Sequence, residues 1–482
     1  MPRLSITDHL RLTLGDVADV ASRTFFPSVR LGVTGLSRAG KTVFITALVH
    51  AFLKGGRLPL FEPLTGGRLI GAKLDPQPDD DVPRFSYEDH LKALVEDRIW
   101  PQSTRQIAEL RIAVRYESAS FLGRQLGPGS LNIDIVDYPG EWLLDLPLLD
   151  QDFATFSDTA LSGAGAPERT EAAKPFLDRI ATLTPDQPAD EMLARELAEA
   201  FAAYLKACRA DQRALSMLPP GRFLMPGDLE GSPALTFAPL PAGETGALRD
   251  SPLGRLMEHR FEAYKRIVAK PFFIHHFARL DRQIVLVDVL SAINAGPAAV
   301  ADLEAALAGI LSCFKSGGGL ERLLPARRID RILLAASKAD HVHESDHDRL
   351  EAILKRLTDR AIDKARLSGV EVEAIALAAV RATRQASLRD GGETLPAIAG
   401  VPLAGEVIDG QTFDGAREVA IFPGDLPSTP DRLFDRDRPP EPIRFVRFRP
   451  PKLEKTADGL SLALPHIRLD RALSFLLADR LS

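Results

Sequence analysis

Residues 28–52 of the chain read SVRLGVTGLSRAGKTVFITALVHAF. The first part, Val29 to Thr34, is a short apolar run that is typical of a buried strand. The octet from Gly35 to Thr42 then follows the pattern of a Gly, four residues and Gly-Lys-Ser/Thr. Residues 43–52 carry apolar side chains at helical spacing. The stretch therefore predicts a strand, a phosphate-binding loop and a helix, in the order that such a loop requires.

This predicted loop suits a nucleoside triphosphate for geometric and electrostatic reasons. Gly35 and Gly40 allow backbone turns that point N–H groups at a phosphate, and the dipole of the following helix points to the same place. Lys41 would place its charge at the β- and γ-phosphates, and the Thr42 hydroxyl would be a ligand of Mg²⁺. The alternative is a strand–helix turn that binds nothing. The predicted nucleotide contacts of the loop are Gly35, Ser37, Arg38, Ala39, Gly40, Lys41, Thr42 and Val43.

The length and composition of the chain indicate a globular protein of two or three domains. Its 482 residues are too many for one compact core to be expected. The formal net charge of −6 gives no global attraction to nucleic acid or anionic lipid, and we expect no nucleic-acid partner. Cys208 and Cys313 are too few for a disulfide framework, which favours a reducing cytoplasm. We find no signal peptide and no apolar run of the roughly 20 residues that a membrane span needs.

Apolar periodicity predicts six strands, separated by helical and irregular stretches. Residues 148–262 are rich in Ala, Leu and Glu, and predict a mainly helical insertion with a rigid, irregular segment from Leu218 to Leu240. Gly55 to Phe85 is predicted to be a long loop, and the chain is again rich in Pro and Gly from about Ala382. The predicted strands are 29–34, 107–116, 131–136, 283–288, 331–336 and 370–377. The predicted helices include 6–23, 43–52, 87–98, 193–213, 297–314, 347–366 and 469–481.

Three further short motifs each follow a predicted strand. Residues 137–140, Asp-Tyr-Pro-Gly, have the Asp-x-x-Gly pattern, in which Asp137 can hold Mg²⁺ through water and Gly140 can offer its N–H to a γ-phosphate. Residues 337–340, Ser-Lys-Ala-Asp, resemble the guanine-reading box of GTPases. Each motif by itself could be a surface turn, but their order and their positions after strands favour a guanine-nucleotide site. The third motif resembles the loop whose backbone contacts the guanine oxygen, and comprises Ala378, Ala379 and Val380.

The second motif predicts which base is bound. Guanine presents adjacent N1–H and N2–H donors, and the carboxylate of Asp340 can accept both. Adenine has an acceptor at N1, which the same carboxylate would repel. The aliphatic stem of Lys338 can cover the face of the base, and Ser337 begins the box. GTP and GDP with Mg²⁺ are therefore the predicted ligands, and an ATPase is the less favoured alternative.

The chain also resembles the bacterial YcjX family, in peptides that run from Thr34 to Ala472. They include TGLSRAGKTVFIT, PRFSYE, WPQST, DYPGEW, PGRFLMPGDLEG and PHIRLDRA. The resemblance implies a GTP-binding, stress-associated protein with a Ras-like domain and an inserted helical domain, linked to the phage-shock response. Thr104 matches the family's Trp-Pro-x-x-Thr, and lies before the second strand, where GTPases keep the switch Thr that senses Mg²⁺ and γ-phosphate. The alternative for Thr104 is a local cap in a loop.

The predicted fold is α/β, a Ras-like phosphate-loop G-domain with an inserted mainly helical domain and a C-terminal extension. We expect an N-terminal helix at residues 1–23, a G-domain in two parts at 24–145 and 263–390, and the helical domain at 146–262. Residues 391–482 are expected to pack on the G-domain. The predicted function is slow Mg²⁺-dependent GTP hydrolysis that drives a conformational switch in a bacterial stress response. The alternative is a nucleotide-bound scaffold without turnover. We expect a cytoplasmic protein, with a protein effector and peripheral contact with the inner membrane as candidate partners.

Two departures from Ras-like sequences predict that hydrolysis is slow. Ras-like enzymes place Gln directly after Asp-x-x-Gly, where this chain has Glu141, and a carboxylate beside a γ-phosphate is unfavourable unless protonated or turned away. Gα proteins carry an Arg finger two residues before the switch Thr, where this chain has Gln102. Arg38, Arg98 and Arg105 are candidates nearby. The candidate catalytic residues are Lys41, Thr104, Glu141 and Arg38, and the candidate metal ligands are Thr42, Thr104 and Asp137.

Two other groups of residues have alternative interpretations. His341, His343 and His347 form either a metal site or a solvated turn that leads into the next predicted helix. Arg222 and Asp228, in the Pro/Gly-rich peptide of the insertion, either anchor it to the G-domain or form a second site.

Overall fold

We describe the protein from a computed structural model. The described residues are 27–482 except 37, 103–105, 121–124, 126, 211–212, 244–246, 313–328, 368, 391, 409, 440, 445 and 454–462. Several sequence predictions therefore lie outside the described residues. These are the N-terminal helix at residues 1–23, the phosphate-loop residue Ser37, the candidate switch residue Thr104, and Arg105 and Cys313.

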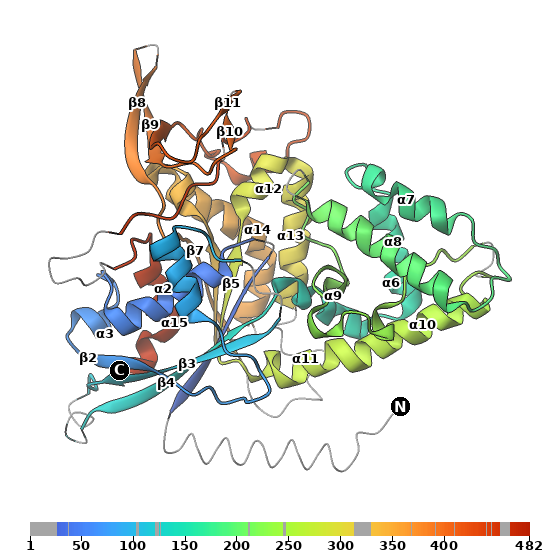
Figure 1. Ribbon diagram of the computed structural model, residues 1–482, viewed down its shortest axis with the longest axis horizontal. Coiled ribbons are helices and arrows are strands. Elements are labelled where there is room, and N and C mark those ends of the chain that lie inside the picture. The colour runs from blue at the N-terminus through green and yellow to red at the C-terminus, as the bar shows by residue number, and fades with distance from the viewer. Residues whose placement is uncertain are drawn as a thin grey trace.

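A seven-stranded sheet forms the centre of the protein (Figure 1). From β4 to β7 in the order below, neighbouring strands are parallel, whereas β3 is antiparallel to both of its neighbours. The register pairs Val33 of β1 with Asp137 of β4, and Gly35 with Leu286 of β5. The carboxyl ends of β1, β4, β5, β6 and β7 therefore meet at one edge of the sheet. The order is β2 (Leu69–Asp75), β3 (Ala108–Tyr116), β4 (Gly129–Asp137), β1 (Ser28–Gly35), β5 (Arg282–Val287), β6 (Arg331–Ala336) and β7 (Glu371–Ala376).

All six predicted strands are present, and β2 is an additional edge strand. It lies within Gly55–Phe85, where we predicted a loop, so that prediction is wrong for β2 and for α3 (Glu62–Thr65). No residue of β2 is fully buried, and its pairing with β3 is irregular between Leu69 and Gly71. The pairing with β3, rather than burial of its own side chains, therefore places the strand in the sheet.

Helices cover both faces of the sheet, because the central strands carry apolar side chains on both sides. In β5, Ile284 and Leu286 face one layer, whereas Val285 and Val287 face the other. The first layer contains α2 (Lys41–Lys54), α4 (Tyr87–Lys92) and α15 (Leu469–Leu477). The second layer contains α12 (Val289–Ala295), α13 (Pro297–Ser312) and α14 (His347–Leu367).

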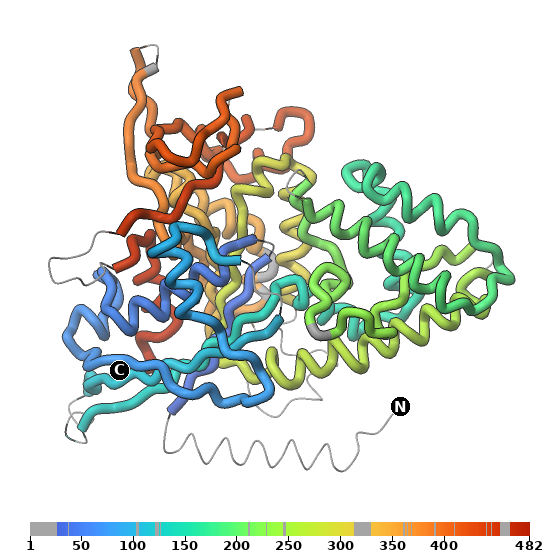
Figure 2. The backbone as a smooth tube through the Cα atoms, in the orientation of Figure 1, coloured from blue at the N-terminus to red at the C-terminus, as the bar shows by residue number. Residues whose placement is uncertain are grey.

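A group of helices between β4 and β5 lies to one side of the sheet (Figure 2). Aromatic rings fill its interior, and Phe156 and Phe261 stack with their ring centroids 4.8 Å apart. The same apolar cluster continues onto the second face of the sheet through Trp142 and Tyr138. The group follows the 3₁₀ segment η2 (Gly140–Asp150) and comprises α6 (Phe153–Ala164), α7 (Thr170–Ile180), α8 (Glu191–Arg209), α9 (Gly221–Leu224), α10 (Pro252–Tyr264) and α11 (Lys270–His275).

Helix α8 is positioned by a cap and by one apolar face. The carboxylate of Asp190 accepts hydrogen bonds from the N–H groups of Met192 and Leu193, at 2.7 and 3.1 Å. Leu197 and Phe201 are buried one turn apart, as the helical period requires of a face that packs on a core. The helix ends at Arg209, before the predicted end at residue 213, and its last turn faces the phosphate loop across a cavity described below.

The Pro- and Gly-rich segment after Ala382, for which we predicted no strands, contains antiparallel strands. Strands β8 (Arg384–Asp390), β9 (Glu393–Gly400) and β12 (Val419–Ile421) form a three-stranded sheet, and β10 (Val407–Ile408) pairs with β11 (Gln411–Thr412). Asp390 pairs with Glu393, so the predicted domain boundary at residue 390 falls in a hairpin turn. Contacts between side chains on neighbouring strands stabilise these short strands.

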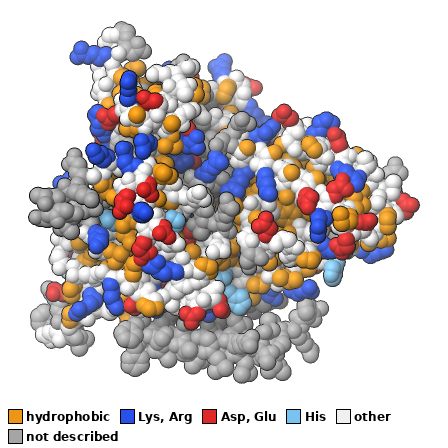
Figure 3. All heavy atoms as spheres, in the orientation of Figure 1, with side chains coloured by type: hydrophobic (Ala, Val, Ile, Leu, Met, Phe, Trp, Pro, Cys, Tyr) orange, Lys and Arg blue, Asp and Glu red, His pale blue; other side chains and the backbone are white. Residues whose placement is uncertain are grey.

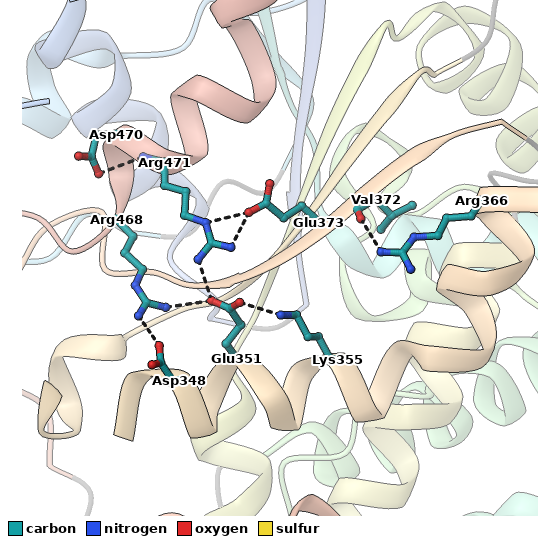
Figure 4. Close-up of polar contacts among 9 residues, drawn as sticks. All are labelled: Asp348, Glu351, Lys355, Arg366, Val372, Glu373, Arg468, Asp470 and Arg471. Atoms are coloured by element: carbon teal, nitrogen blue, oxygen red, sulfur yellow. Dashed lines mark hydrogen bonds and ion pairs between the residues drawn. The ribbon is translucent and has the colours of Figure 1, made fainter. Parts of the chain in front are cut away.

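The C-terminal helix α15 is held to the sheet by apolar contacts and by an ion-pair network (Figure 4). Arg471 pairs with Glu373 of β7 and, at 3.1 Å, with Glu351 of α14. Arg468 also pairs with Glu351, at 2.9 Å, and with Asp348. Glu351 is only 10% exposed, so it contributes more than a solvated surface pair would. The C-terminal helix thereby joins α14 to the last strand of the large sheet.

None of the helices in the described part of the chain is long and apolar enough to cross a membrane. On the face that Figure 3 shows, Lys and Arg side chains are interspersed with Asp and Glu side chains. This mixture agrees with the small net charge of the chain.

Candidate functional site

The loop after β1 has the backbone geometry of an anion-binding turn. Arg38 and Gly40 both have left-handed backbone conformations, with φ of 57° and 84°. Such a φ is strained for Arg38, and strain of this kind is concentrated in ligand-binding loops. The N–H of Ala39 donates to the carbonyl of Leu36 at 3.0 Å, and helix α2 begins at Lys41. The first N–H groups of α2 have no carbonyl partner within the helix, and are available to an anion.

The side chains of the first turn of α2 follow directly on the loop after β1. Lys41 and Val43 are half-buried, and Thr42 is buried. The Thr42 hydroxyl donates to the carbonyl of Gln102 at 3.4 Å. Thr42 therefore joins the phosphate loop to the segment in which we predicted the switch threonine.

The Asp-x-x-Gly motif lies directly against the phosphate loop. Asp137 is fully buried at the end of β4, beside Val33 of β1. A Cβ atom at Gly140 would overlap the carbonyl group of Gly35, so only glycine allows this approach of the two backbones. A hydroxyl from Thr42 and a carboxylate from Asp137 are hard oxygen donors, which is the donor chemistry that Mg²⁺ requires.

The guanine-box residues lie at the end of β6 and are held in place by backbone contacts. Asp340 is 4% exposed, and its carboxylate accepts a hydrogen bond from the N–H of Ala382 at 2.8 Å. Ser337 is also buried, and its N–H donates to the carbonyl of Val287. Lys338 has a left-handed backbone, with φ of 60°, and its ammonium group pairs with Asp288.

The loop from Ala378 to Val380 lies beside this box. The N–H of Ala339 donates to the carbonyl of Leu377 at 3.1 Å, which joins the two motifs. Ala378 exchanges two backbone hydrogen bonds with Ile467, so the C-terminal segment fixes the loop from its other side. Ala379 is half-buried and Val380 is buried.

A cavity of about 270 Å³ joins the phosphate loop to the guanine box. Cationic side chains from four parts of the chain line it, and two carboxylates face them. The Asp288 carboxylate holds Lys338 and also accepts hydrogen bonds from the N–H and hydroxyl of Ser291. The charged lining residues are Arg38, Arg209, Lys338, Arg447, Asp288 and Glu406. The structure thus brings Arg38 and Lys338 to one site, as predicted from the sequence.

Glu141, directly after Gly140, pairs with the helical group. Its carboxylate is 2.7 Å from the guanidinium of Arg209, the last residue of α8, and its side chain is 6% exposed. A Cβ atom at Gly221 would overlap the carbonyl of Glu141, so the backbone of α9 lies directly on this residue. The carboxylate is therefore buried with a cationic partner.

The segment before the undescribed residues 103–105 is attached to the C-terminal region. Arg98 donates from Nε to the carbonyl of Pro450 at 3.1 Å, and Trp100 donates from Nε1 to the carbonyl of Phe448 at 2.6 Å. The ring of Phe448 also contacts that of His341, the residue after Asp340. The same C-terminal segment therefore contacts the candidate switch segment and the guanine box.

The histidine group is structural in the described part of the chain, which has no cluster of three metal-binding side chains. His341 is packed against Phe448, and the ring of His347 hydrogen-bonds to the carbonyl of Ala339. Both are buried, so the alternative of a solvated turn is wrong for them as well. Burial lowers the pKa of both imidazoles.

Arg222 anchors the helical group to η2. Its guanidinium carbon lies 3.2 Å from the centroid of the Trp142 ring, and the indole N–H of Trp142 donates to the carbonyl of Met225 at 3.0 Å. Of the two interpretations of this peptide, the structure supports the anchor. The side chain of Asp228 lies outside the described residues. Cys208 is buried in the core.

Sequence reasoning missed four charged residues of the cavity, namely Arg209, Asp288, Glu406 and Arg447. Asp288 follows a strand, as Asp137 does, and caps a helix, so it could have been found from the sequence. Arg209 had no such signal, because it is one of several charged residues at the end of an amphipathic helix. Only the packing of α8 on α9, which in turn packs on η2, brings it to Glu141.

Comparisons with known proteins agree on one family. A family model described as the YcjX-like family, DUF463, matches residues 29–481. The Ras-like GTPase YcjX of Escherichia coli (strain K12) is 39% identical over 469 residues, which cover 94% of this chain and 96% of that relative. The Ras-like GTPase YcjX of Shewanella oneidensis is 34% identical over 480 residues, which cover 95% and 96%. The mixed α/β fold with its mainly parallel sheet is consistent with a Ras-like phosphate-loop GTPase.

Proposed function

Because the chain belongs to the YcjX-like family, we propose that it binds guanine nucleotides and hydrolyses GTP. One observation carries this proposal. The phosphate loop, the Asp137–Gly140 motif and the Ser337–Asp340 box lie together at the carboxyl edge of one sheet, where open α/β sheets bind ligands. The phosphate loop supplies hydrogen-bond donors for phosphates, the Asp137–Gly140 motif supplies an oxygen ligand for a cation, and the Ser337–Asp340 box supplies an acceptor for a base.

The base site favours guanine over adenine. The Asp340 carboxylate is buried, so an approaching base would meet it with little screening by water. Its hydrogen bond from Ala382 holds it in one orientation and leaves lone pairs for the two adjacent guanine donors. Adenine would place an acceptor against the same carboxylate. Ser337, Lys338 and the loop of Ala378, Ala379 and Val380 complete the base site.

The phosphate site assigns separate tasks to the loop residues. The backbone N–H groups from Gly35 to Val43, with Lys41, bind the phosphates. Thr42 and Asp137 hold Mg²⁺ when it is bound, with Thr104 as the third proposed contact, and the cation offsets the charge of the β- and γ-phosphates. Gly140 offers its N–H to the γ-phosphate. Its contact with Gly35 makes its backbone sensitive to any movement of the loop.

Turnover is slow in this proposal. Glu141 takes the place where Ras-like enzymes use Gln, and it pairs with Arg209, so it is not poised to orient an attacking water. Arg38 lines the cavity at the phosphate loop and is the candidate for stabilising charge on the γ-phosphate. Bound GTP is therefore hydrolysed slowly, and the protein acts as a timed switch.

The switch acts through the helical group, in a stress response such as the family resemblance implies. We propose that residues 24–145 and 263–390 form the G-domain, that 146–262 form an inserted helical domain, and that 391–482 pack on the G-domain. Gly140 contacts the phosphate loop while Glu141 contacts α8, so a change at the γ-phosphate has a direct route to the helices. A cytoplasmic location, a protein effector and contact with a membrane surface belong to this proposal.

Single-turnover hydrolysis tests the function. The full chain is mixed with GTP and Mg²⁺, and phosphate release is compared with the release from ATP and with a sample that contains EDTA. We expect GTP to be hydrolysed at well below one turnover per second, and only with Mg²⁺. Equal binding of ATP and GTP would refute the guanine assignment, and GTP binding without any phosphate release would support a scaffold instead.

A further inference from the structure

We propose that Arg209 is a positioning residue that neutralises Glu141 beside the phosphate loop and so allows GTP to bind as well as GDP. The inference rests on the proposed function, because it places a guanine nucleotide at that loop. It assigns to helix α8 a direct part in distinguishing a triphosphate from a diphosphate.

Glu141 is confined close to the phosphate loop by its neighbours in the chain. Gly140, which precedes it, lies against the backbone of Gly35, and Gly221 lies against its own carbonyl group. Both approaches are closer than any side chain permits, so the backbone at Glu141 is enclosed on two sides. The side chain is 6% exposed, and water cannot screen its charge. A carboxylate in this position needs a cationic partner.

Arg209 supplies that partner from a different part of the fold. Its guanidinium lies 2.7 Å from the Glu141 carboxylate and lines the same cavity as Leu36 and Arg38 of the phosphate loop. The other cations of the cavity, Lys338 and Arg447, face Asp288 and Glu406, with which they pair. Among the ion pairs described for this cavity, the Arg209 pair is the one that reaches the residue after Asp-x-x-Gly.

Loss of Arg209 would leave a buried negative charge next to the γ-phosphate position. At an effective dielectric constant of about 20, repulsion by one uncompensated charge in the same site weakens the binding of a like charge by at least roughly tenfold. GDP has no γ-phosphate and would be affected less. The distinguishing quantity is therefore the ratio of the two affinities, not either affinity alone.

The experiment measures the affinity of the full chain for a fluorescent GDP and a fluorescent non-hydrolysable GTP analogue, both with Mg²⁺. We expect Arg209→Ala to weaken binding of the GTP analogue about tenfold relative to GDP. Arg209→Lys keeps the charge and should retain most of the wild-type ratio. Adding Glu141→Gln to Arg209→Ala removes the unpaired carboxylate and should restore the ratio.

Arg213→Ala is the matched control. Arg213 lies four residues after Arg209, pairs with Glu171 of α7 and is not among the residues that line the cavity, so its loss should leave the ratio unchanged. The inference is overturned if Arg209→Ala weakens both nucleotides equally, or if Glu141→Gln fails to restore the ratio. Those outcomes leave the proposed function intact, whereas a wild-type chain that binds neither nucleotide refutes the proposed function and this inference together.

Discussion

Replacing Asp145 by an asparagine should remove a large pH dependence from the stability of the protein. Asp145 lies in η2, is 2% exposed, and accepts a hydrogen bond from the N–H of Gly221 at 2.6 Å. Burial raises the pKa of its carboxyl group from the ordinary 3.8 to about 7, although Tyr264, Gly221 and Arg222 partly offset this effect. The folded protein therefore keeps Asp145 protonated at pH values where the unfolded chain has released the proton.

The sign and size of the effect follow from this difference. Since the folded state binds the proton more tightly, the free energy of unfolding falls as the pH rises from about 4 to about 7, and is level above that. The two pKa values differ by about 3, and a difference of one is worth about 1.4 kcal/mol, so the total loss is about 4 kcal/mol. Between pH 5 and pH 8 the expected loss is about 2 to 3 kcal/mol.

Urea unfolding at a series of pH values measures this loss. Tryptophan fluorescence reports on the relevant segment, because Trp142 is buried in η2 itself. The side-chain amide that D145N introduces can still accept from the Gly221 N–H and carries no charge. The free energy of unfolding of wild type should fall by about 2 to 3 kcal/mol between pH 5 and pH 8 because of Asp145, and D145N should not show this fall. D178N is the control, since Asp178 of α7 is 63% exposed. Parallel pH profiles of wild type and D145N would refute the reasoning.

Three further predictions concern the nucleotide site. Lys41→Ala should weaken nucleotide binding by at least roughly 100-fold, because a charged contact to the phosphates is lost. The circular dichroism spectrum should be unchanged. Unchanged affinity in a fluorescent-GDP titration would contradict the phosphate-loop assignment. Asp340→Asn should weaken GTP binding and favour xanthine nucleotide, whose C2 oxygen suits an amide donor, while the amide oxygen can still accept the hydrogen bond from the N–H of Ala382. Competition titrations compare the two bases. An unaltered preference for guanine would count against Asp340 as the residue that recognises the base. Glu141→Gln should raise single-turnover phosphate release, because a neutral amide can orient water. If Glu141→Ala abolishes hydrolysis instead, Glu141 itself positions the water or acts as a base.

The sequence alone determined the strands of the large sheet that are buried on both sides, and the motifs that follow them. Residues 332–336 are a continuous apolar run, and Val29 to Thr34 is apolar apart from Arg30 and Thr34; such runs have few alternatives to a central parallel strand. The phosphate loop, Asp137 and Asp340 were found for a related reason. Their chemistry depends on residues that are adjacent in the chain, so the motifs can be recognised from the local sequence.

Tertiary structure alone decided the edge strand β2, the small C-terminal sheet and the contacts between distant segments. Strand β2 and the hairpin of β8 and β9 form because a neighbouring strand supplies their hydrogen bonds, and their own side chains are largely exposed or half-buried. The pairing of Glu141 with Arg209 joins two segments that are far apart in the sequence, and it depends on how α8 packs on α9 and α9 packs on η2. Local sequence patterns show that a charged residue is present. The partner that compensates its charge is determined by the packing of segments that are distant in the sequence.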